Sequence, residues 1–531
     1  MHRSFLVFAF LLFASLISGQ SFTSNLPIIK ITTTNVIEDE EKVEARMQIM
    51  DQDINLSSDS VFAIDELIGI EFRGSSSQIF PKKAYGLEVR DKDGDDKDVS
   101  IFGWPEEADY VLFASYNEKS FLHNVISMEM ARSMGMYAPR TRFVELMINN
   151  QYQGLYVLME KIKRDKGRVD IAKLDPDENS GDDLTGGYLL KIDKFTGTIN
   201  YFFESLFKSS KEKKIFYQLD TPKEPSEQQK AYIRNYINTV ESRFASSNYK
   251  DSQLGYRSFI DVSSFVKFFL VSEVSRNMDA YRISSFLHKD KDSNDPRLKM
   301  GPVWDFDIAY GNADYCEGSR HDLWAYKFNE ICPFDDLQVP FWWEKLMSDP
   351  YFFDEVRKEY SLQRTAGFLQ ESKITSTIDS LVEVIQFAQS RNFVRWPILG
   401  EYVWPQPQPI ATSWNGEVSE LRNWFKKRIF WLDGQFLLSN LENENSNQTF
   451  ISPNPTNSFG LATISHLRPG TYQLTLSNMT GQVFYNQKAR LDAETRLSDV
   501  VGNFSHLSAG LYFIHLRSGT ETLTLKLMLH D

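Results

Sequence analysis

The sequence predicts an α+β protein in which a large region of strands and then helices is followed by a small β-sandwich. Three observations support this. The chain has 531 residues, which is long for one domain. Apolar alternation dominates from about residue 26 to 170, and helical spacing dominates from about 185 to 437. A polar, Asn-rich segment (441–452) then precedes a last stretch of short strands (453–531).

Composition and charge limit the class of partner. Hydrophobic residues make up 42% of the chain, which is enough for full-sized cores, and the formal net charge is −14. Nucleic acids and anionic membranes attract proteins with a basic surface, so we expect neither as the main partner. A local basic pocket for a phosphate group remains compatible with this balance.

The first residues have the pattern of a secretory signal peptide. An early arginine, an apolar run and small residues near Ser18 and Gly19 predict that residues 1–19 are removed and that the mature chain begins at residue 20. An uncleaved membrane anchor is the alternative, but the apolar run is short for a span and no charged stop follows it. No other segment is long and apolar enough to cross a membrane, so we expect no transmembrane segment in the mature chain.

The chain has two cysteines, Cys316 and Cys332. An even number in an exported protein favours a disulfide, because exported proteins meet an oxidising environment. Two separate free thiols are the alternative.

A Gly- and Ser-rich loop is predicted between two strands within residues 68–91. Apolar residues alternate on both sides of the loop, which indicates a strand pair. Gly74 permits close approach of the backbone, and the serines from Ser75 supply amides and hydroxyls. Together with Arg73 they form a candidate phosphate-binding loop. An ordinary hairpin loop is the alternative, because this pattern alone is weakly specific.

A lysine and a glutamate are predicted to pair behind this loop. Lys83 shares strand parity with Tyr85, so we expect it to face inward, whereas Lys82 should face solvent. A buried amine needs an anion. The helix predicted over 117–135 places Glu129 on its buried stripe, so Glu129 is the expected partner. Protein kinases position ATP phosphates with such a pair, although a buried pair can also be merely structural.

A strand pair joined by a turn near residues 149–154 runs into the basic connector EKIKRDKGR (160–168). In a two-lobed nucleotide-binding enzyme this connector would be the hinge. The backbone from Glu160 to Ile162 would then face the nucleotide base. A surface loop after a hairpin is the alternative.

Two carboxylates interrupt an apolar run in KMGPVWDFDIAYGN (299–312). If this run is extended, Asp305 and Asp307 point to one side, where two like charges repel each other. Mg²⁺ or Mn²⁺ shared with substrate phosphates would relieve that repulsion. The alternative is that the strand ends before Asp305 and that both acids are solvated loop residues.

Asp279 lies 26 residues before Asp305, and a predicted strand pair (282–289 and 298–306) lies between them. Protein kinases have the same layout of a catalytic-loop aspartate, a short hairpin and a metal-binding aspartate. Asp279 is therefore the candidate to accept or orient the proton of an acceptor hydroxyl. The chain has no His-Arg-Asp triplet there and no asparagine five residues after Asp279, so it is not an ordinary protein kinase by motif.

The last region predicts two hairpins, 471–487 and 510–529, the second with leucines alternating from Leu523 to Leu529. It contains the segments SPNPT (452–456), TGQVFY (480–485) and LSAGLYFIHLRSG (507–519). With these it resembles the C-terminal sorting domain of proteins exported by the type IX (Por) secretion system. The resemblance covers residues 449–531. It implies secretion or anchoring at the outer surface, with the type IX machinery as a partner.

The larger region resembles the CotH family of secreted or spore-coat atypical kinases. The resemblance spans about residues 60–435 and is carried by segments in a fixed order: RGSSS, PKKAYGLE, GGYLLKIDK, NMDAYRISSFLHKD and GPVWDFDIAYGNADY. It implies a two-lobed atypical protein-kinase-like domain over residues 20–440, with lobes at about 26–170 and 185–437.

The same resemblance implies ATP with Mg²⁺ or Mn²⁺ and phosphorylation of Ser or Thr hydroxyls on proteins. By matching position, Asp305 would bind the metal and Asp279 would be the catalytic-loop aspartate, with Lys83 and Glu129 as the nucleotide-positioning pair. A family does not fix a function, so a non-catalytic surface protein that uses this fold for binding or adhesion is the alternative.

Overall fold

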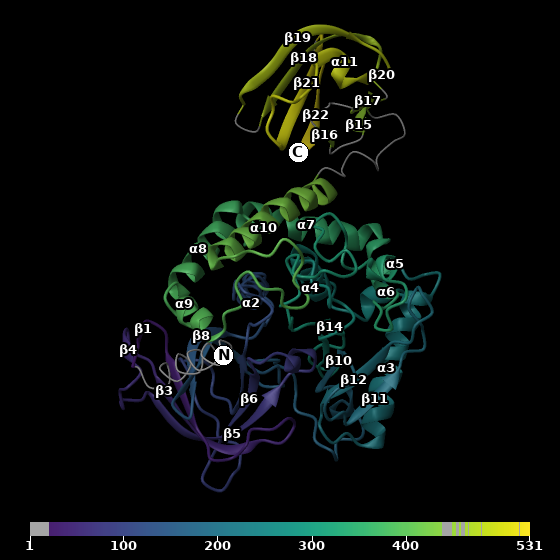
Figure 1. Ribbon diagram of the computed structural model, residues 1–531. Helices are drawn as coiled ribbons and strands as arrows, with labels where there is room; N and C mark the ends of the chain where they lie inside the picture. Colours follow the sequence, from purple (N-terminus) through teal and green to yellow (C-terminus); the bar gives the residue numbers. More distant parts are fainter. Residues whose placement is uncertain are drawn as a thin grey trace. The chain divides into compact units, whose positions relative to one another are not determined.

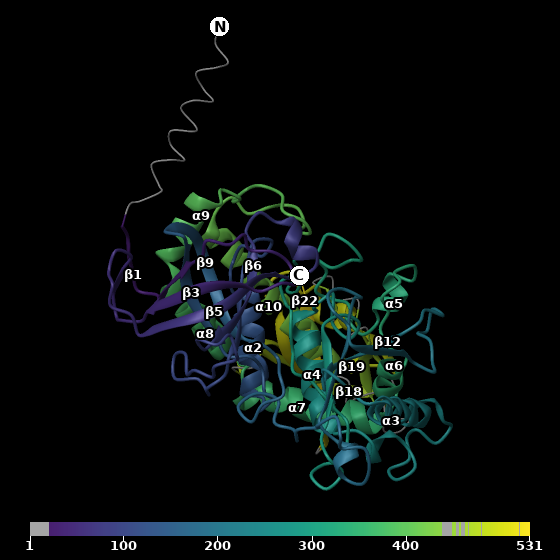
Figure 2. The ribbon, with the colours of Figure 1, turned by 90° about the horizontal axis from the view of Figure 1, so that it is seen from below.

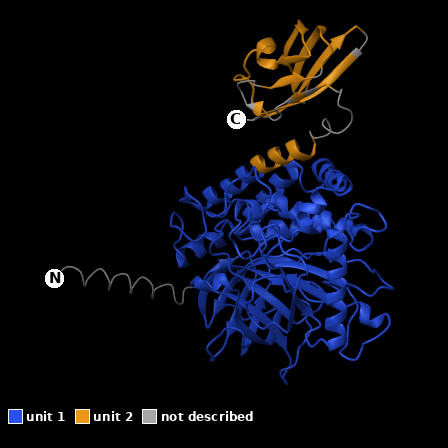
Figure 3. Cartoon of the chain, turned by 90° about the vertical axis from the view of Figure 1, so that its right-hand side faces the viewer, with its two compact units in different colours: residues 1–425 blue, residues 426–531 orange. Residues whose placement is uncertain are grey.

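The computed structural model describes residues 21–437, 449–452, 456–457, 462–465, 467–478, 481–519 and 521–530. The chain divides into two compact units, residues 1–425 and 426–531 (Figure 3). The boundary falls within helix α10 (Trp414–Phe436). The expected signal peptide, and residues 441–448 of the expected linker, lie outside the described residues.

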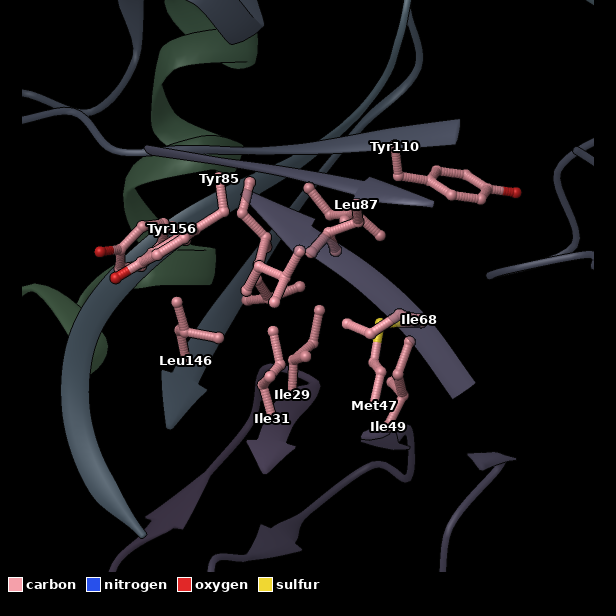
Figure 4. Close-up of a cluster of buried hydrophobic side chains, with 14 of the residues drawn as sticks. Ile29, Ile31, Met47, Ile49, Ile68, Tyr85, Leu87, Tyr110, Leu146 and Tyr156 are labelled. Carbon is pink, nitrogen blue, oxygen red and sulfur yellow. The ribbon is translucent and has the colours of Figure 1, made fainter. Parts of the chain in front are cut away.

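The larger unit begins with strands, as the apolar alternation predicts, and these strands form a closed barrel. Its order is β2-β3-β5-β6-β7-β9-β8, closed by parallel pairing of β2 with β8. The core inside the barrel is built from the inward-facing residues of these strands, among them Ile29, Met47, Ile68, Leu87 and Tyr156 (Figure 4). The strands are β2 (Ile28–Thr32), β3 (Val43–Met50), β5 (Ile64–Arg73), β6 (Ala84–Arg90), β7 (Asp109–Phe113), β8 (Thr141–Ile148) and β9 (Gln151–Glu160).

Short elements complete the first part of this unit. Strands β1 (Thr23–Ser24) and β4 (Asn55–Leu56) pair with each other, and the 3₁₀ turn η1 (Ser76–Ile79) lies in the loop between β5 and β6. The predicted helix is α2 (His123–Ser133), which begins later than its expected caps. Ser120 instead accepts a hydrogen bond from Leu122 N (3.2 Å), so it fixes the turn before the helix.

A second sheet has the strand order β11-β12-β10-β13-β14. The sequence predicted only the β13/β14 pair, which is present (Ser285–Lys289 and Lys299–Met300), although β14 is much shorter than expected. The sequence did not reveal strands β10 (Tyr188–Ile192), β11 (Tyr201–Glu204) and β12 (Phe216–Thr221), which follow the 3₁₀ turn η2 (Asp183–Thr185). Figure 1 shows these strands beside α3 (Glu227–Ala245).

One face of β11 and β12 packs against α3. Tyr217 donates a hydrogen bond to Glu241 of α3 (2.8 Å), and the Lys230 ammonium lies 5.7 Å from the centre of the Tyr201 ring. Figure 2 views the unit from below, with β3, β5 and β9 on one side and β12, α3 and α6 on the other.

Helix α4 (Val262–Ser275) is the buried centre of the helical part. Asp261 caps it by accepting a hydrogen bond from Ser264 N (2.9 Å), and the helix ends at Arg276, which adopts a left-handed conformation. It is apolar on nearly every side, as expected of a helix with neighbours all around. The other elements are η3 (Tyr256–Ser258), α5 (Phe328–Ile331), α6 (Trp342–Met347), α7 (Pro350–Ala366), α8 (Glu371–Ile385) and α9 (Ala388–Arg395).

The predicted disulfide between Cys316 and Cys332 is present, with the Cα atoms 5.8 Å apart. The loop that it closes is held on the end of α4. Glu273 accepts hydrogen bonds from Ala325 N and Tyr326 N, both at 2.9 Å, and Arg276 donates to the Glu317 carbonyl (2.6 Å). These contacts attach the disulfide loop to the end of α4, and the segment that contains Asp279 follows directly after that end.

The smaller unit contains the expected strand-rich C-terminal region. Both predicted hairpins are present, as β18/β19 and β21/β22, and Leu525, Leu527 and Leu529 are buried in a core to which both of its sheets contribute. Its elements are β15 (Phe450–Ser452), β16 (Thr456–Asn457), β17 (Thr463–Ser465), β18 (Gly470–Asn478), β19 (Val483–Leu491), β20 (Glu494–Arg496), α11 (Leu497–Val501), β21 (Gly510–Ser518) and β22 (Glu521–His530).

Within the described ranges, none of the helices has the length and apolar character needed to span a bilayer.

Candidate functional site

The two acids of the WDFD segment lie in a turn that follows β14. The expectation that residues 301–307 are extended is wrong, because the strand ends at Met300 and Asp305 has a φ of 67°. A non-glycine residue in this left-handed region is strained and is often held so at a functional site. The alternative is correct in that the strand ends before Asp305, but the two acids are not freely solvated, because both side chains are half-buried.

Asp305 is electrostatically unfavourable as an isolated ion. Burial raises the pKa of its carboxyl well above the usual range, and the neighbouring carboxylates of Asp307 and Asp279 raise it further. Burial also raises the pKa of Asp279, against the opposing effect of Arg282, whose Nη2 lies 3.2 Å from Asp279 Oδ1. The structure therefore brings Asp279, Asp305 and Asp307 together, as their order in the sequence suggested.

Amide side chains hold this acidic cluster in place. Asn117 Nδ2 donates to Asp307 Oδ2 (3.0 Å), and Asn312 Nδ2 donates to the Asp307 carbonyl (2.8 Å). Asn277 Nδ2 donates to the Asp305 carbonyl (2.8 Å). These asparagines come from three separate segments, so sequence spacing could not have identified them as a set.

Lys194 is the amine of the site. Its Nζ donates to Ser76 Oγ (2.8 Å), and its charge opposes the raised pKa values of Asp305 and Asp279. Lys194 follows β10, and Gln218 of β12 fixes the turn by donating to the carbonyls of Asp193 and Lys194, both at 2.9 Å. Lys194 is the last residue of the KIDK segment, so the amine was visible in the sequence. Its position beside Asp305, however, follows only from the register of β10 against β13.

The Gly- and Ser-rich loop contacts Lys194 through Ser76. The guanidinium of Arg73 lies 5.7 Å from the centre of the Trp304 ring. Asp305 is among the carboxylates whose negative charge raises the pKa of Arg73, against the effect of burial. Burial lowers the pKa of Arg73, and the charges of Glu71 and Asp220 oppose this. Gly74 has a φ of 107°, and a Cβ there would lie 2.1 Å from Ser77 Oγ, so the turn requires glycine. Ser75 is exposed at the loop tip.

The two lysines that precede β6 differ from the expectation, which is wrong for Lys82. Lys82, expected in solvent, is 2% exposed, and its Nζ donates to the Leu155 carbonyl (2.6 Å) and to Asn392 Oδ1 (3.0 Å) of α9. Burial lowers the pKa of Lys82 to about 7. Lys83 is half-buried and donates to the Gln78 carbonyl (2.5 Å) within the loop.

Glu129 does not meet Lys83. In the part of the chain that the structure describes, no ion pair joins the two, and Glu129 is half-buried rather than buried. The negative charge of Glu129 instead raises the pKa of Arg132, one turn further along α2, against the effect of burial. The expected single buried stripe does not describe α2, because this helix is buried on nearly every side and Glu129 is one of its few partly exposed positions.

Glu160 ends β9 and is fully buried. Its carboxylate accepts from Arg140 Nη1 (2.6 Å) and Arg140 N (2.8 Å), and its own N–H donates to the Arg140 carbonyl (3.2 Å). The side chain is therefore occupied in fixing the connector that follows β9. Nearby, Lys161 and Lys163 both lie 2.9 Å from carboxylate oxygens of Asp109.

The donor set of the acidic cluster fits a divalent cation that is completed by its substrate. No group of three or more His, Cys, Asp or Glu side chains suited to a metal occurs among the described residues. Mg²⁺, however, is usually bound by one or two carboxylates, with phosphate oxygens and water filling the remaining positions. Asp305 and Asp307 supply such a pair, and burial raises the pKa of Asp305.

The fold and the acidic cluster belong to a chain that is built for export. Comparison with known families matches residues 450–530 to a secretion system C-terminal sorting domain, which marks the chain for type IX secretion and for a cell-surface or secreted location. The chain belongs to the CotH kinase protein family, whose model matches residues 70–432.

Comparisons with individual proteins add little. A solved structure of PorZ, a surface component of the type-IX secretion system of Porphyromonas gingivalis, is similar at 16% identity with a TM-score of 0.14. The similarity covers 17% of this chain and 13% of that chain, and a likeness of this extent does not define the fold. No curated protein matches the sequence.

Proposed function

We propose that this protein is an exported, metal-dependent atypical protein kinase that transfers the γ-phosphate of ATP to Ser or Thr hydroxyls. The barrel and the helical part would be the two lobes of a kinase-like domain. The observation that carries the proposal is the position of Lys194, which contacts the Gly- and Ser-rich loop and lies beside the acidic cluster. A phosphate chain needs this combination of backbone amides, an amine and a metal site.

The loop and two basic side chains would hold the nucleotide. The backbone of Gly74 and Ser75 offers N–H groups to phosphate oxygens, as glycine-rich loops do. Arg73 and Lys194 add positive charge on either side of the loop. Lys194 takes the phosphate-positioning role that the sequence suggested for Lys83, since Lys83 is bound to the Gln78 carbonyl. The segment that begins at Glu160 would face the base.

Asp305 and Asp307 would hold the cation, and their asparagine partners would fix the orientation of the cluster. A divalent cation bound there would neutralise charge on the phosphate oxygens. Asp279 would orient the acceptor hydroxyl and accept its proton. The acceptor oxygen then bonds to the γ-phosphorus while the bond from that phosphorus to the β–γ bridging oxygen breaks, and ADP leaves. Arg282, 3.2 Å from Asp279, would hold the carboxylate in position.

The direct test is transfer of ³²P from labelled ATP to a mixed protein substrate in the presence of Mn²⁺. We expect transfer by the mature chain, and a loss of at least about a hundredfold on Asp279→Asn, which is the size of contribution typical of general base catalysis. Asp53→Asn, an exposed change far from the cluster in sequence, is the control. Undiminished transfer by Asp279→Asn would contradict the assignment. Absence of transfer by the mature chain would favour the non-catalytic binding function.

A further inference from the structure

Three phenylalanines form an exposed aromatic cluster beside the candidate site. Phe195 follows Lys194 directly, Phe202 lies in β11 and Phe216 begins β12. The ring of Phe195 lies 4.9 Å from that of Phe202 and 5.1 Å from that of Phe216, between ring centres. Phe195 is 46% exposed and Phe202 48%. Large apolar side chains gathered in contact at a surface typically mark a binding site, whereas scattered ones do not.

The alternation of the strands places this cluster on the face of the sheet opposite α3. Phe203 and Tyr217 point toward α3 and are buried, so Phe202 and Phe216 point to the opposite face. Gln218 shares that face with Phe216 and donates to the carbonyls of Asp193 and Lys194. The aromatic cluster is therefore continuous with the turn that carries the site amine.

The turn that precedes Phe195 contacts the segment that follows Asp279. The end of β10 pairs with the start of β13, and Asp193 accepts a hydrogen bond from Ser284 N (3.3 Å), five residues after Asp279. The loop between β11 and β12 also reaches the neighbourhood of Arg282. Lys213 lies 2.6 Å from Asp336, and Asp335 lies 3.5 Å from Arg282.

The same loop is basic in a chain that is strongly acidic. Residues 205–215 contain four lysines and one glutamate, against a net charge of −14 for the whole chain. Lys208, Lys213 and Lys214 have acidic neighbours, whereas Lys211 is exposed and has no ion-pair partner among the residues described. A segment seated on the aromatic cluster would meet these lysines next, and an acidic segment is favoured there.

We infer that Phe195, Phe202 and Phe216 form the docking surface for the acceptor polypeptide. This inference rests on the proposed function. The occupant is an extended segment that inserts one large apolar side chain between the rings and presents acidic residues to the 205–215 loop. Strand β11 is at the edge of its sheet, so its backbone can pair with such a segment. The docking surface would thus select hydroxyls in acidic sequences with a nearby aromatic or aliphatic residue.

The test uses three fluorescein-labelled serine peptides and the mature full chain. The first peptide has glutamates and one phenylalanine around the serine, the second replaces that phenylalanine by alanine, and the third replaces the glutamates by lysines. Fluorescence anisotropy gives the dissociation constants for wild type, Phe202→Ser and Phe387→Ser. Phe387 is 61% exposed on the turn between α8 and α9 and serves as the matched control.

We expect Phe202→Ser to bind the first peptide about tenfold more weakly, which corresponds to ~1.4 kcal/mol, and Phe387→Ser to bind as wild type does. The alanine peptide should show the same loss on wild type and no further loss on Phe202→Ser. The lysine peptide should bind most weakly of the three. Equal affinities for wild type and Phe202→Ser, or a lysine peptide that binds as tightly as the first, would overturn the inference, as would a first peptide that does not bind.

Stabilisation by Mn²⁺ and ATP, measured on the same samples, separates this inference from the proposed function. Phe202→Ser should keep the full nucleotide-dependent rise in melting temperature, because Phe202 does not line the phosphate site. Phenylalanine-dependent peptide binding without any nucleotide effect in the wild type would support the docking surface and would contradict the kinase function. A Phe202→Ser chain that loses its nucleotide effect has a disturbed site, and would overturn the assignment of Phe202 to docking alone.

Discussion

Lys194 Nζ donates a hydrogen bond to Ser76 Oγ at 2.8 Å, which joins the turn after β10 to the loop between β5 and β6 across 118 residues of sequence. This single contact ties the second sheet to the barrel at the point where the acidic cluster lies. It also makes Lys194, rather than a lysine of the barrel, the amine that shares a site with Asp305.

Replacing Lys194 by methionine should weaken nucleotide binding. A charge-assisted contact to a phosphate contributes roughly 2 kcal/mol, so we expect Lys194→Met to lose about thirtyfold in affinity for ATP with Mn²⁺. The measurement is isothermal titration calorimetry on the mature chain. Lys83→Met is the matched control and should change affinity by less than about threefold, since Lys83 bonds to the Gln78 carbonyl. The reverse ranking would restore Lys83 as the phosphate lysine.

The acidic cluster should cost stability when no cation is bound. Asp305→Asn removes one of three neighbouring negative charges and keeps the shape of the side chain, so it should stabilise the metal-free protein by about 1 kcal/mol. The melting temperature in the presence of EDTA is the readout. Asp53→Asn should leave it unchanged, because Asp53 is exposed. A destabilised Asp305→Asn chain would mean that the carboxylate makes a structural contact worth more than the repulsion.

Glu241 should make the stability depend on pH. It is buried on α3, accepts hydrogen bonds from Ser205 Oγ (2.7 Å) and Tyr217 OH (2.8 Å), and burial raises its pKa from the ordinary 4.5 to about 7. Between pH 4.5 and about pH 7, Glu241 therefore holds a proton in the folded chain that it has released in the unfolded chain. The contribution of Glu241 to stability is therefore present below pH 4.5 and is lost as the pH rises to about 7, by roughly 3 kcal/mol in total.

Glu241→Gln should remove that dependence, because an amide keeps both hydrogen-bond partners and does not titrate. The readout is the change in urea midpoint between pH 5 and pH 7, where the Glu241→Gln chain should show a flatter profile. Glu227→Gln is the control on the same helix, since Glu227 is exposed and pairs with Lys230. Parallel profiles for Glu241→Gln and wild type would contradict the assignment.

Asn392 should be coupled to Lys82. Its Oδ1 accepts from Lys82 Nζ (3.0 Å) and from Leu155 N (3.1 Å), which attaches α9 to the barrel. Asn392→Leu leaves the buried Leu155 N–H without its acceptor and removes one of the acceptors of Lys82 Nζ, which keeps the Leu155 carbonyl. It should therefore cost about 1–3 kcal/mol. In a Lys82→Met background the same change should cost at least about 1 kcal/mol less. Urea unfolding measures the cycle, and exact additivity would show that the contact contributes nothing.

The strands of the barrel were predictable because each buries one face, which imposes alternation on residues such as Ile68, Ile70 and Leu87, whereas their closure into a barrel was not. The same rule failed for Lys82 and Lys83. Strand β6 begins only at Ala84, so parity does not extend back to them, and α9 covers Lys82 from outside the barrel. A helix more than 300 residues further along the chain leaves no sign in the local pattern.

The residues of the acidic cluster could be predicted from the sequence, but their arrangement in space could not. The order of Asp279, Asp305 and Asp307 indicated a site, since like charges in an apolar run need compensation. Asp305 has a left-handed conformation, and the contacts that fix the two acids come from other segments, since Asn277 donates to the Asp305 carbonyl and Asn117 to the Asp307 carboxylate. Lys194 is recognisable only once β10 is paired with β13, because its partners are set by the register of that pair.

The central claim is that Asp305 and Lys194 belong to one metal-dependent nucleotide site. Isothermal titration calorimetry of ATP with Mn²⁺ into the mature chain and into Asp305→Asn tests it most directly. The account predicts saturable, Mn²⁺-dependent binding by the mature chain that falls at least about a hundredfold, or ~2.7 kcal/mol, in Asp305→Asn. Equal binding by both chains, or no binding of ATP by the mature chain with either Mn²⁺ or Mg²⁺, would contradict it.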